Sequence, residues 1–409
     1  MSAFAENTNI FSYAFEIMKS VDVNQYPWLC MKVMVLGCGK IGTVMAREFH
    51  RRVPTSQITM ADIDEGRARN ATAAIPGAGW AVIDTSDKGA LLEKIEGSDL
   101  TLGALPGDYG YVAIKAAIEA GVNMVDVSFT VEDPTKLDAE AKERGVTVIP
   151  DCGVAPGLSN ILVGYGASRL DRVNSAQIMV GGIPETPVPP LGYTVTWSAE
   201  GLIDEYVRSA HIVKDGKIVE VPALSGLEEV KFPGVGTLEA FYTDGLRTLT
   251  KSMPGVIDMW EKTLRYPGHV EKVRLLKDLG FFSEEPVTVQ GVKVSPRLAT
   301  ARMLERSLWM PDVGDLLAMQ IIVSGESGRK QRGYMFRVLD SYDHEGKVSA
   351  MARTTGYTAA IVASKLATGR INQVGVVPPE KLGMDQSFTK ELVSELKKMN
   401  IMIEEEKAG

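Results

Sequence analysis

The segment from Lys32 to Asp64 limits the possible fold more than any other part of the chain. A short β-branched run, Lys32–Leu36, leads into the glycine-rich turn Gly37–Gly42. Apolar residues then recur at spacings of three and four, and a second apolar run ends at Asp62, twenty residues after the third glycine. This order of strand, glycine turn, helix, strand and acid is typical of a domain that binds a dinucleotide.

Each glycine of the turn has a predicted task. Gly37 permits the tight turn, Gly39 lets the backbone approach a pyrophosphate, and Gly42 allows close packing of helix against strand. Free N–H groups at the helix start, where Lys40 and Ile41 lie, then face the phosphates. The alternative is a glycine-rich turn in some other α/β protein.

Asp62 predicts which cofactor is bound. A carboxylate at this point accepts hydrogen bonds from the ribose hydroxyls and repels a 2′-phosphate. No basic residue adjoins Asp62 in the sequence, because Arg67 and Arg69 fall on the following helix. NAD is therefore favoured over NADP, with Ile63 placed beside Asp62 at the cofactor.

The alternation of strands and helices continues to about residue 150. Ligands of an open parallel sheet lie beyond the carboxyl ends of its strands. Asp84 after the third strand is therefore expected to flank the adenine, and Ala104, Leu105 and Pro106 after the fourth are expected to border the cofactor. The further strands expected are Trp80–Ile83, Leu100–Leu105, Met124–Val127 and Val146–Ile149.

The predicted fold class is α/β, a doubly wound Rossmann sheet followed by a second domain of α+β character. Residues 1–30 form an N-terminal extension, 31–155 the nucleotide domain, 156–345 a substrate and dimerisation domain, and 346–409 helices that return to the first domain.

Several patterns after residue 155 predict a mixed or antiparallel sheet. Asp215-Gly216 indicates a hairpin, and the runs Leu316–Val323 and Tyr334–Asp343 indicate a longer one. A long, interrupted helical stretch is expected from Leu238 to Phe282, and the closing EEEKAG is expected to be a charged, mobile end.

Composition excludes several classes of function. A formal charge of −8 without a basic stripe argues against a nucleic-acid partner. Three cysteines without metal-ligand spacing argue against a metal site and favour a reducing cytoplasm. No uninterrupted apolar run is long enough to cross a membrane.

Six segments resemble the saccharopine dehydrogenase-like superfamily, over residues 31 to 380. Within it the chain is most similar to L-lysine 6-dehydrogenase. That resemblance implies NAD-dependent oxidative deamination of the ε-amino group, giving ammonia and an aldehyde that cyclises to piperideine carboxylate, and it implies a homodimer. The segments are VLGCGKIG, DCGVAPGLSNILVG, GYTVTWSAEGLIDEY, LEAFYTDGLRTL, TLRYPGHVEKVRLLKDLGFF and SMARTTGYTAAIVASKLATG.

Two departures separate the chain from the similar glutamate-forming saccharopine dehydrogenases. Those enzymes typically carry a D-P-G-I-D-H-like run where this chain has Ala155–Asn160, and they commonly place a basic residue for NADP near the position of Asp62. Both departures favour a smaller substrate.

Oxidation of an amine-bearing carbon requires a neutral amine. A lysine ε-amine has an unperturbed pKa of about 10.4, so its deprotonation at pH 7 costs roughly 4.6 kcal/mol. Two residues are candidates for the base: Asp151, after the sixth strand, and His269, whose ordinary pKa is closer to the task. A hinge carboxylate and a core or capping histidine are the respective alternatives.

Substrate contacts are predicted mainly from the second domain. Arg247 and Arg265 are the leading choices to clamp an amino-acid carboxylate, with surface ion pairs as the alternative. Asp244 is suited to the α-ammonium. The remaining candidates are hydroxyl side chains, with Thr243 and Ser128 assigned to the substrate and Thr355 to the cofactor.

Three functions stay open at this point. The first is the lysine ε-dehydrogenase. The second is a reductase that joins an amine to a carbonyl, such as a saccharopine or carboxynorspermidine dehydrogenase. The third is a nucleotide-binding regulator without turnover.

Overall fold

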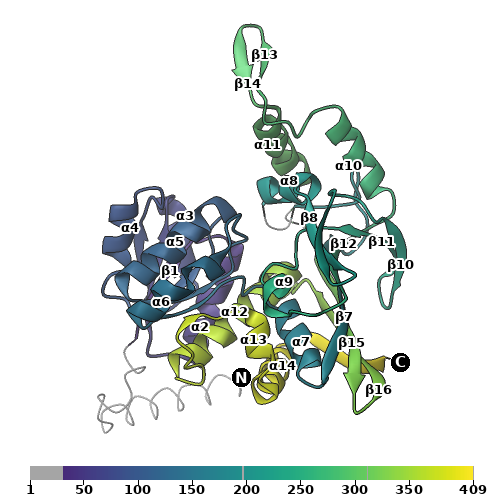
Figure 1. Cartoon of the computed structure of the whole chain (residues 1–409). Helices are drawn as coiled ribbons and strands as arrows, with labels where there is room; N and C mark the ends of the chain where they lie inside the picture. The colour runs from purple at the N-terminus through teal and green to yellow at the C-terminus, as the bar shows by residue number, and fades with distance from the viewer. Residues whose placement is uncertain (1–30, 196–197, 311, 409) are drawn as a thin grey trace, which may run out of the picture.

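Two large β-sheets, with a set of C-terminal helices between them, form most of the described part of the chain (Figure 1). The computed structural model describes residues 31–195, 198–310 and 312–408. The predicted N-terminal extension, residues 1–30, lies outside the described residues.

The first sheet is parallel and, in the described residues, seven-stranded. Its first six strands lie in the order 3-2-1-4-5-6 of a Rossmann fold, as predicted. An unpredicted seventh strand comes from the C-terminal part of the chain and pairs with the sixth. In spatial order the strands are β17 (Gly375–Val376), β6 (Thr147–Ile149), β5 (Asn123–Asp126), β4 (Leu100–Gly103), β1 (Lys32–Leu36), β2 (Gln57–Asp62) and β3 (Gly79–Val82).

Helices connect these strands and confirm the doubly wound α/β class. The longest of the connecting helices, α5, ends where Gly121 adopts a left-handed conformation with φ +71°. The helices of this half are α2 (Lys40–Arg52), α3 (Glu65–Thr72), α4 (Lys88–Ile95), α5 (Gly107–Ala120), the 3₁₀ turn η3 (Pro134–Leu137) and α6 (Asp138–Arg144).

The second sheet is mixed and, in the described residues, nine-stranded, which confirms the α+β expectation. Only its central pair β12–β7 is parallel. The main path is β10 (Glu228–Phe232), β11 (Gly236–Tyr242), β12 (Asp258–Arg265), β7 (Arg172–Pro184), β15 (Asp315–Ser327), β16 (Lys330–Ser341) and β18 (Met402–Ala408), with β8 (Ala210–Lys214) and β9 (Lys217–Val221) beside β12.

Both predicted hairpins are present. Asp215 and Gly216 have φ of +50° and +73° between β8 and β9, the conformation that a tight two-residue turn requires. Strands β15 and β16 pair antiparallel over their whole length. The other elements of this half are α7 (Leu158–Ala167), α8 (Ala199–Val207), α9 (Leu249–Ser252), α10 (His269–Asp278), α11 (Pro296–Leu308) and the small hairpin β13 (Val287–Val289) and β14 (Val292–Val294).

Two expectations for this half are wrong. The stretch 238–282, expected to be helical, contains β11 and β12 as well as α9 and α10, because its apolar residues pack into a sheet whose central strands are buried. The tail, expected to be mobile, forms β18 on the edge of β16. Buried Ile401 and Ile403 anchor it, and Glu406 pairs with Arg337 at 2.6 Å.

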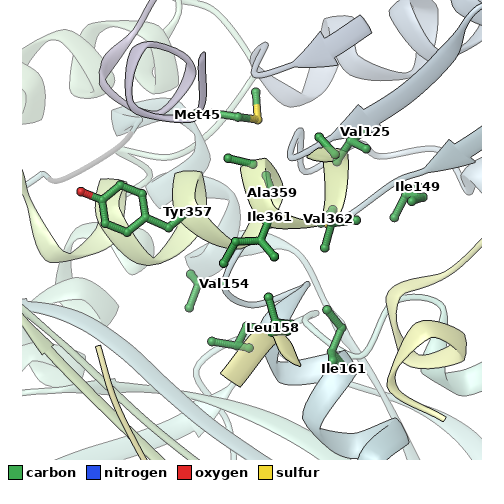
Figure 2. Packing of buried hydrophobic residues seen from close by; sticks show 14 of the residues in the cluster. Met45, Val125, Ile149, Val154, Leu158, Ile161, Tyr357, Ala359, Ile361 and Val362 are labelled. Atoms are coloured by element: carbon green, nitrogen blue, oxygen red, sulfur yellow. The ribbon is translucent and has the colours of Figure 1, made fainter. Parts of the chain in front are cut away.

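The C-terminal helices follow β16 in the chain. They are α12 (Ala350–Ala367), α13 (Pro379–Gly383) and α14 (Gln386–Lys398). The first of them, α12, contacts α2 and β5 of the first half. Helix α12 is buried along almost its whole length, and Figure 2 shows Ala359, Ile361 and Val362 among residues of the first sheet, α2 and α7. At Gly356 a Cβ atom would lie 2.9 Å from Val44 Cγ1 of α2, so the two helices approach closely. Helix α12 thus joins the two halves through a continuous core.

Candidate functional site

Two of the three glycines in the turn are crowded by neighbouring backbone, and the third faces open space. Gly37 has φ +93°, and a Cβ atom there would lie 2.3 Å from the Ala104 carbonyl oxygen. At Gly42 a Cβ atom would lie 1.9 Å from the Gly37 oxygen. At Gly39, by contrast, a Cβ atom would meet nothing within 4 Å. Since Gly39 precedes α2 and makes no side-chain cap, the helix start is free to receive a phosphate.

Asp62 lies at the end of β2, directly beside this turn. Its Oδ2 accepts a hydrogen bond from the Cys38 amide at 2.9 Å, and its Oδ1 accepts one from the Asp64 amide. Arg67 Nη2 lies 3.1 Å from Asp62 Oδ1. The premise that no basic residue adjoins Asp62 is therefore wrong, because the first turn of α3 brings Arg67 back to the end of β2.

The other residues predicted for the cofactor lie at or near the same edge of the first sheet, although the Lys40 side chain extends toward the second half. Ile63 and Asp84 are exposed after β2 and β3. Ala104, Leu105 and Pro106 lie between β4 and α5, beside the glycine turn. Lys40 differs, since its Nζ lies 4.0 Å from the centre of the Trp309 ring, which comes from the second half of the molecule.

A cavity of about 150 Å³ lies between the two halves. The first half contributes Ile41 of α2, Val127 and Phe129 after β5, and the loop 153–156. The second half contributes α8, β7, β12 and the loop after β11, and α12 adds Met351 and Thr355. The cavity thus joins the carboxyl edge of the Rossmann sheet to the mixed sheet. The predicted residues that line it are Ile41, Thr243, Asp244, Arg265 and Thr355.

Four acidic side chains and two arginines line this cavity. Each arginine forms an ion pair with one of the acids. Arg265 Nη2 lies 2.7 Å from Glu205 Oε2, and Arg208 Nη2 lies 3.9 Å from Asp204 Oδ2. The charged lining residues are Asp204, Glu205, Asp244, Glu261, Arg208 and Arg265. The lining has more acids than bases, so it favours a ligand that carries a cationic group.

Glu261 on β12 is the most deeply buried of these acids, with 4% of its surface exposed. Thr243 Oγ1 donates to its Oε2 at 2.6 Å, and Thr263 Oγ1 lies 2.8 Å from Thr243 Oγ1. Burial, and secondarily the neighbouring carboxylates Glu205 and Asp244, raises the pKa of Glu261 to about 8. A carboxyl group with this pKa can exchange a proton near neutral pH.

Sequence analysis missed Glu205, Glu261, Arg208 and Phe129 as lining residues. The segment GLIDEYVR, which holds Glu205 and Arg208, and the run DMWEKTLR, which holds Glu261, each place charged residues among apolar ones. That local signal is shared by many surface helices and strands, so only the packing of α8 against β12 distinguishes them.

Asp151 and Arg247, predicted as base and carboxylate clamp, are bound to each other. Arg247 Nε and Nη2 donate to the two oxygens of Asp151 at 3.1 and 3.2 Å. Arg247 Nη2 also donates to Thr130 Oγ1 at 3.1 Å. Both residues have positive φ, and their side chains are 1% and 8% exposed. The pair therefore connects the end of β6 to the loop before α9, and neither residue lines the cavity.

His269 lies in the core beside α8, and it does not line the cavity either. Its Nδ1 lies 3.0 Å from the Leu191 carbonyl oxygen, so Nδ1–H donates there, and its Nε2 accepts from the Tyr206 hydroxyl at 2.9 Å. Burial, with a smaller effect from Arg265, lowers the pKa of His269 to about 3. The ring is a neutral packing residue in this structure.

Three further predicted residues have definite partners. Ser128 is buried, and both its hydroxyl and its amide donate to Asp126. Asp244 Oδ1 accepts from the His211 amide and lies 3.1 Å from His211 Nδ1. Arg265, besides pairing with Glu205, donates to the Leu264 carbonyl oxygen.

Two general features complete the description of the site. Among the described residues, no group of three or more His, Cys, Asp or Glu side chains is arranged to hold a metal ion. In the same residues, no helix is both long enough and apolar enough to cross a bilayer.

Comparison with known proteins identifies both halves. Residues 33–149 match the family model described as the saccharopine dehydrogenase NADP binding domain. Residues 153–401 match the model described as the saccharopine dehydrogenase C-terminal domain. The first half is therefore a nicotinamide dinucleotide-binding domain, and the preference between NAD and NADP is a separate question.

Individual relatives agree with the family models. A glutamate-forming, NADP-dependent saccharopine dehydrogenase of Pyricularia oryzae is 27% identical over 239 residues, 55% of this chain and 52% of that protein. The chain thus matches about half the length of that relative. A carboxynorspermidine synthase of Vibrio cholerae is 25% identical over 328 residues, 70% of this chain and 73% of that protein.

A solved structure shares the fold. The apo saccharopine dehydrogenase (L-Glu forming) of Saccharomyces cerevisiae superposes with a TM-score of 0.74 at 20% identity, covering 93% of this chain and all of that one. Because the C-terminal family model alone matches more than half of the residues, the chain belongs to the saccharopine dehydrogenase family of oxidoreductases.

Proposed function

We propose that the protein catalyses the NAD-dependent oxidative deamination of the ε-amino group of L-lysine. The products are ammonia and the 6-semialdehyde, which cyclises to piperideine-6-carboxylate. The family comprises oxidoreductases that act on amino acids, and the proposal specifies L-lysine, a small substrate with two amino groups, for this chain. A cytoplasmic location and a homodimer stay predictions of the same kind.

The acidic cavity at the edge of the nucleotide-binding sheet is the observation that carries this proposal. With Glu261 largely protonated at neutral pH, the other three carboxyl groups still exceed the two arginines, so a substrate with an ammonium group gains more there than a dicarboxylate. Arg208, whose contact with Asp204 is long at 3.9 Å, is the lining arginine suited to hold one α-carboxylate. Lysine, with two ammonium groups and one carboxylate, matches this charge pattern, whereas saccharopine carries three carboxylates.

The residues around the glycine turn fit a dinucleotide. The open space at Gly39 and the uncapped start of α2 suit a pyrophosphate, and Asp62 suits a ribose. When bound, the nicotinamide ring supplies the acceptor for the hydride. We favour NAD because Asp62 retains lone pairs for ribose hydroxyls, although Arg67 beside it provides a cation that a 2′-phosphate can use.

Saccharopine or carboxynorspermidine dehydrogenase activity is the second candidate. The names of the relatives from Pyricularia oryzae and Vibrio cholerae favour it. The cavity contacts argue for the smaller substrate, because Arg247, suited to an additional carboxylate, is already bound to Asp151. A nucleotide-binding regulator without turnover is the third.

Absorbance at 340 nm separates these functions. The purified chain is incubated with NAD or NADP and, in separate reactions, L-lysine, saccharopine or carboxynorspermidine. We expect reduced cofactor to form with lysine in the absence of any keto acid, and more rapidly with NAD. Reaction with saccharopine alone would replace the first function by the second, and tight NADH binding without turnover of any amine would favour the regulator.

A further inference from the structure

We propose that Glu261 is the residue that takes the proton from the substrate's ammonium group, an inference that rests on the proposed function. Neither of the bases predicted from sequence occupies the cavity, since Asp151 is bound to Arg247 and His269 is packed in the core. The proton acceptor must therefore be sought among the side chains that line the cavity.

Three of the four acids in the cavity lining already have a cationic or imidazole partner. Asp204 pairs with Arg297 at 2.6 Å, Glu205 with Arg265 at 2.7 Å, and Asp244 with His211 at 3.1 Å. Within the described residues, no Lys, Arg or His side chain forms an ion pair with Glu261. Neutral groups stabilise its charge instead: the Thr243 hydroxyl, which donates at 2.6 Å, and the Gly245 amide.

The charged surroundings of Glu261 suit an acceptor of protons. Glu205 from α8 and Asp244 from the loop after β11 disfavour its ionisation, while the Thr243 hydroxyl and the Gly245 amide favour it. Asp204 of α8, Arg208 directly after it and Arg265 of β12 also face the cavity. An incoming ammonium group would supply the positive charge that Glu261 lacks, and it would deliver a proton to the same oxygen atoms.

The proton balance of the step is simple. The substrate R–CH₂–NH₃⁺ gives one proton to the Glu261 carboxylate, which leaves R–CH₂–NH₂ and a neutral carboxylic acid. The neutral amine would then lose a hydride to the bound oxidised cofactor, and water would convert the resulting iminium to aldehyde and ammonium. Over the whole reaction, the substrate in its ammonium form, the oxidised cofactor and water give aldehyde, ammonium, reduced cofactor and one proton, which leaves through Glu261.

The raised pKa of Glu261 makes this transfer feasible. An ordinary glutamate, with a pKa of about 4.3, would accept a proton from an amine of pKa about 10.4 with an equilibrium constant of roughly one in a million. With the pKa of Glu261 at about 8, the same transfer is unfavourable by a factor of only about 250.

The test is Glu261→Gln, which keeps the size of the side chain and removes the acceptor. We expect kcat with lysine to fall about 10²–10⁴-fold. In the unmodified chain, kcat/KM should rise with pH through about pH 8 as Glu261 ionises. This rising limb of the pH profile should vanish in Glu261→Gln. Glu261→Asp keeps a carboxylate and should retain the limb with intermediate activity. NADH binding, followed by fluorescence, should be unchanged in both variants.

Glu228→Gln is the matched control. Glu228 lies on β10, outside the cavity, and pairs with Lys262, the neighbour of Glu261. The Glu228→Gln variant should leave kcat and the pH profile of kcat/KM unchanged. If the unmodified chain oxidises lysine and Glu261→Gln raises only KM, or keeps the limb near pH 8, Glu261 is not the proton acceptor although the proposed function stands. If the unmodified chain oxidises no amine, the proposed function fails as well.

Discussion

At the scale of single residues, Glu261 and His269 show how burial assigns opposite roles to two titratable groups. Burial disfavours the charged form of both, raising the pKa of Glu261 and lowering that of His269. Glu261 faces a cavity, so its proton can be exchanged with a ligand. His269 uses both ring nitrogens in hydrogen bonds within the core, so its neutral form contributes to stability instead.

The neutral state of His269 predicts a component of acid destabilisation. Its pKa is about 3 in the folded protein and about 6.5 in an unfolded chain, so the unfolded state takes up a proton first as pH falls. The contribution of neutral His269 to the free energy of unfolding is complete above pH 6.5 and is lost as pH decreases toward 3. The free energy of unfolding then falls by up to about 1.4 kcal/mol per pH unit.

Urea unfolding between pH 6.5 and 4 measures this slope. His269→Gln should lower the free energy of unfolding at pH 7 by about 1–3 kcal/mol, because a buried partner is left unpaired, and should reduce the slope below pH 6.5. An equal slope in both proteins would mean that His269 is accessible to protons in the folded state.

At the scale of elements, the glycine turn and the stretch 238–282 show when local pattern is sufficient. In the turn, Gly42 is crowded by the Gly37 oxygen of the same βαβ unit and Gly39 lies in open space, so spacing predicts both positions, whereas Gly37 also faces the Ala104 oxygen beyond β4. In the stretch 238–282, Leu238 and Ala240 share a core cluster with Ile183 and Ala318, and β12 pairs with β7, all more than fifty residues away in sequence. The apolar spacing there is compatible with helix or strand, and sheet pairing determines the outcome.

The turn predicts a contrast between two alanine variants. Gly37→Ala should destabilise the protein by about 1–3 kcal/mol, since the new Cβ atom meets the Ala104 oxygen and φ is positive. Gly39→Ala should change stability by less than about 0.5 kcal/mol, because its Cβ atom enters open space.

For NADH binding we expect the opposite order: among folded molecules, Gly39→Ala should weaken binding more than Gly37→Ala does. Gly39→Ala should weaken NADH binding at least tenfold in a fluorescence titration, because the methyl group lies where the pyrophosphate is expected. Wild-type affinity in this variant would place the phosphates elsewhere. Urea unfolding supplies the matched stability values.

At the scale of the whole molecule, α12 and the Asp151–Arg247 pair connect the two halves around the cavity. Helix α12 packs against α2 and contributes Thr355 to the cavity wall. The ion pair joins residues 96 positions apart and is largely excluded from solvent. The alignment of the two cavity walls depends on both connections.

Removal of one member of this pair should be costly. Arg247→Met leaves Asp151 buried without its cation and should lower the free energy of unfolding by about 3–5 kcal/mol. The double variant Asp151→Asn/Arg247→Met should recover part of this loss, because no uncompensated charge remains. Chemical denaturation of the two single variants and the double variant measures the coupling. Strictly additive effects would mean that the pair does not join the halves energetically.

The parts of this molecule that local pattern determined are those whose cause lies close along the chain. They include the first six strands of the Rossmann sheet, the turn at Gly37–Gly42, the Asp215-Gly216 hairpin and the returning helix α12. Spacing, turn chemistry and apolar periodicity act over a few residues, so a single sequence carries them completely.

The candidate site was settled by contacts between distant segments. Arg247 binds Asp151 instead of facing the cavity, and β18 pairs with β16 although its sequence is a run of charges. Glu261 acquires its environment only when α8 and the loop after β11 close over β12. Burial and charge pairing depend on the complete three-dimensional arrangement, and residue order alone does not encode them in any local pattern.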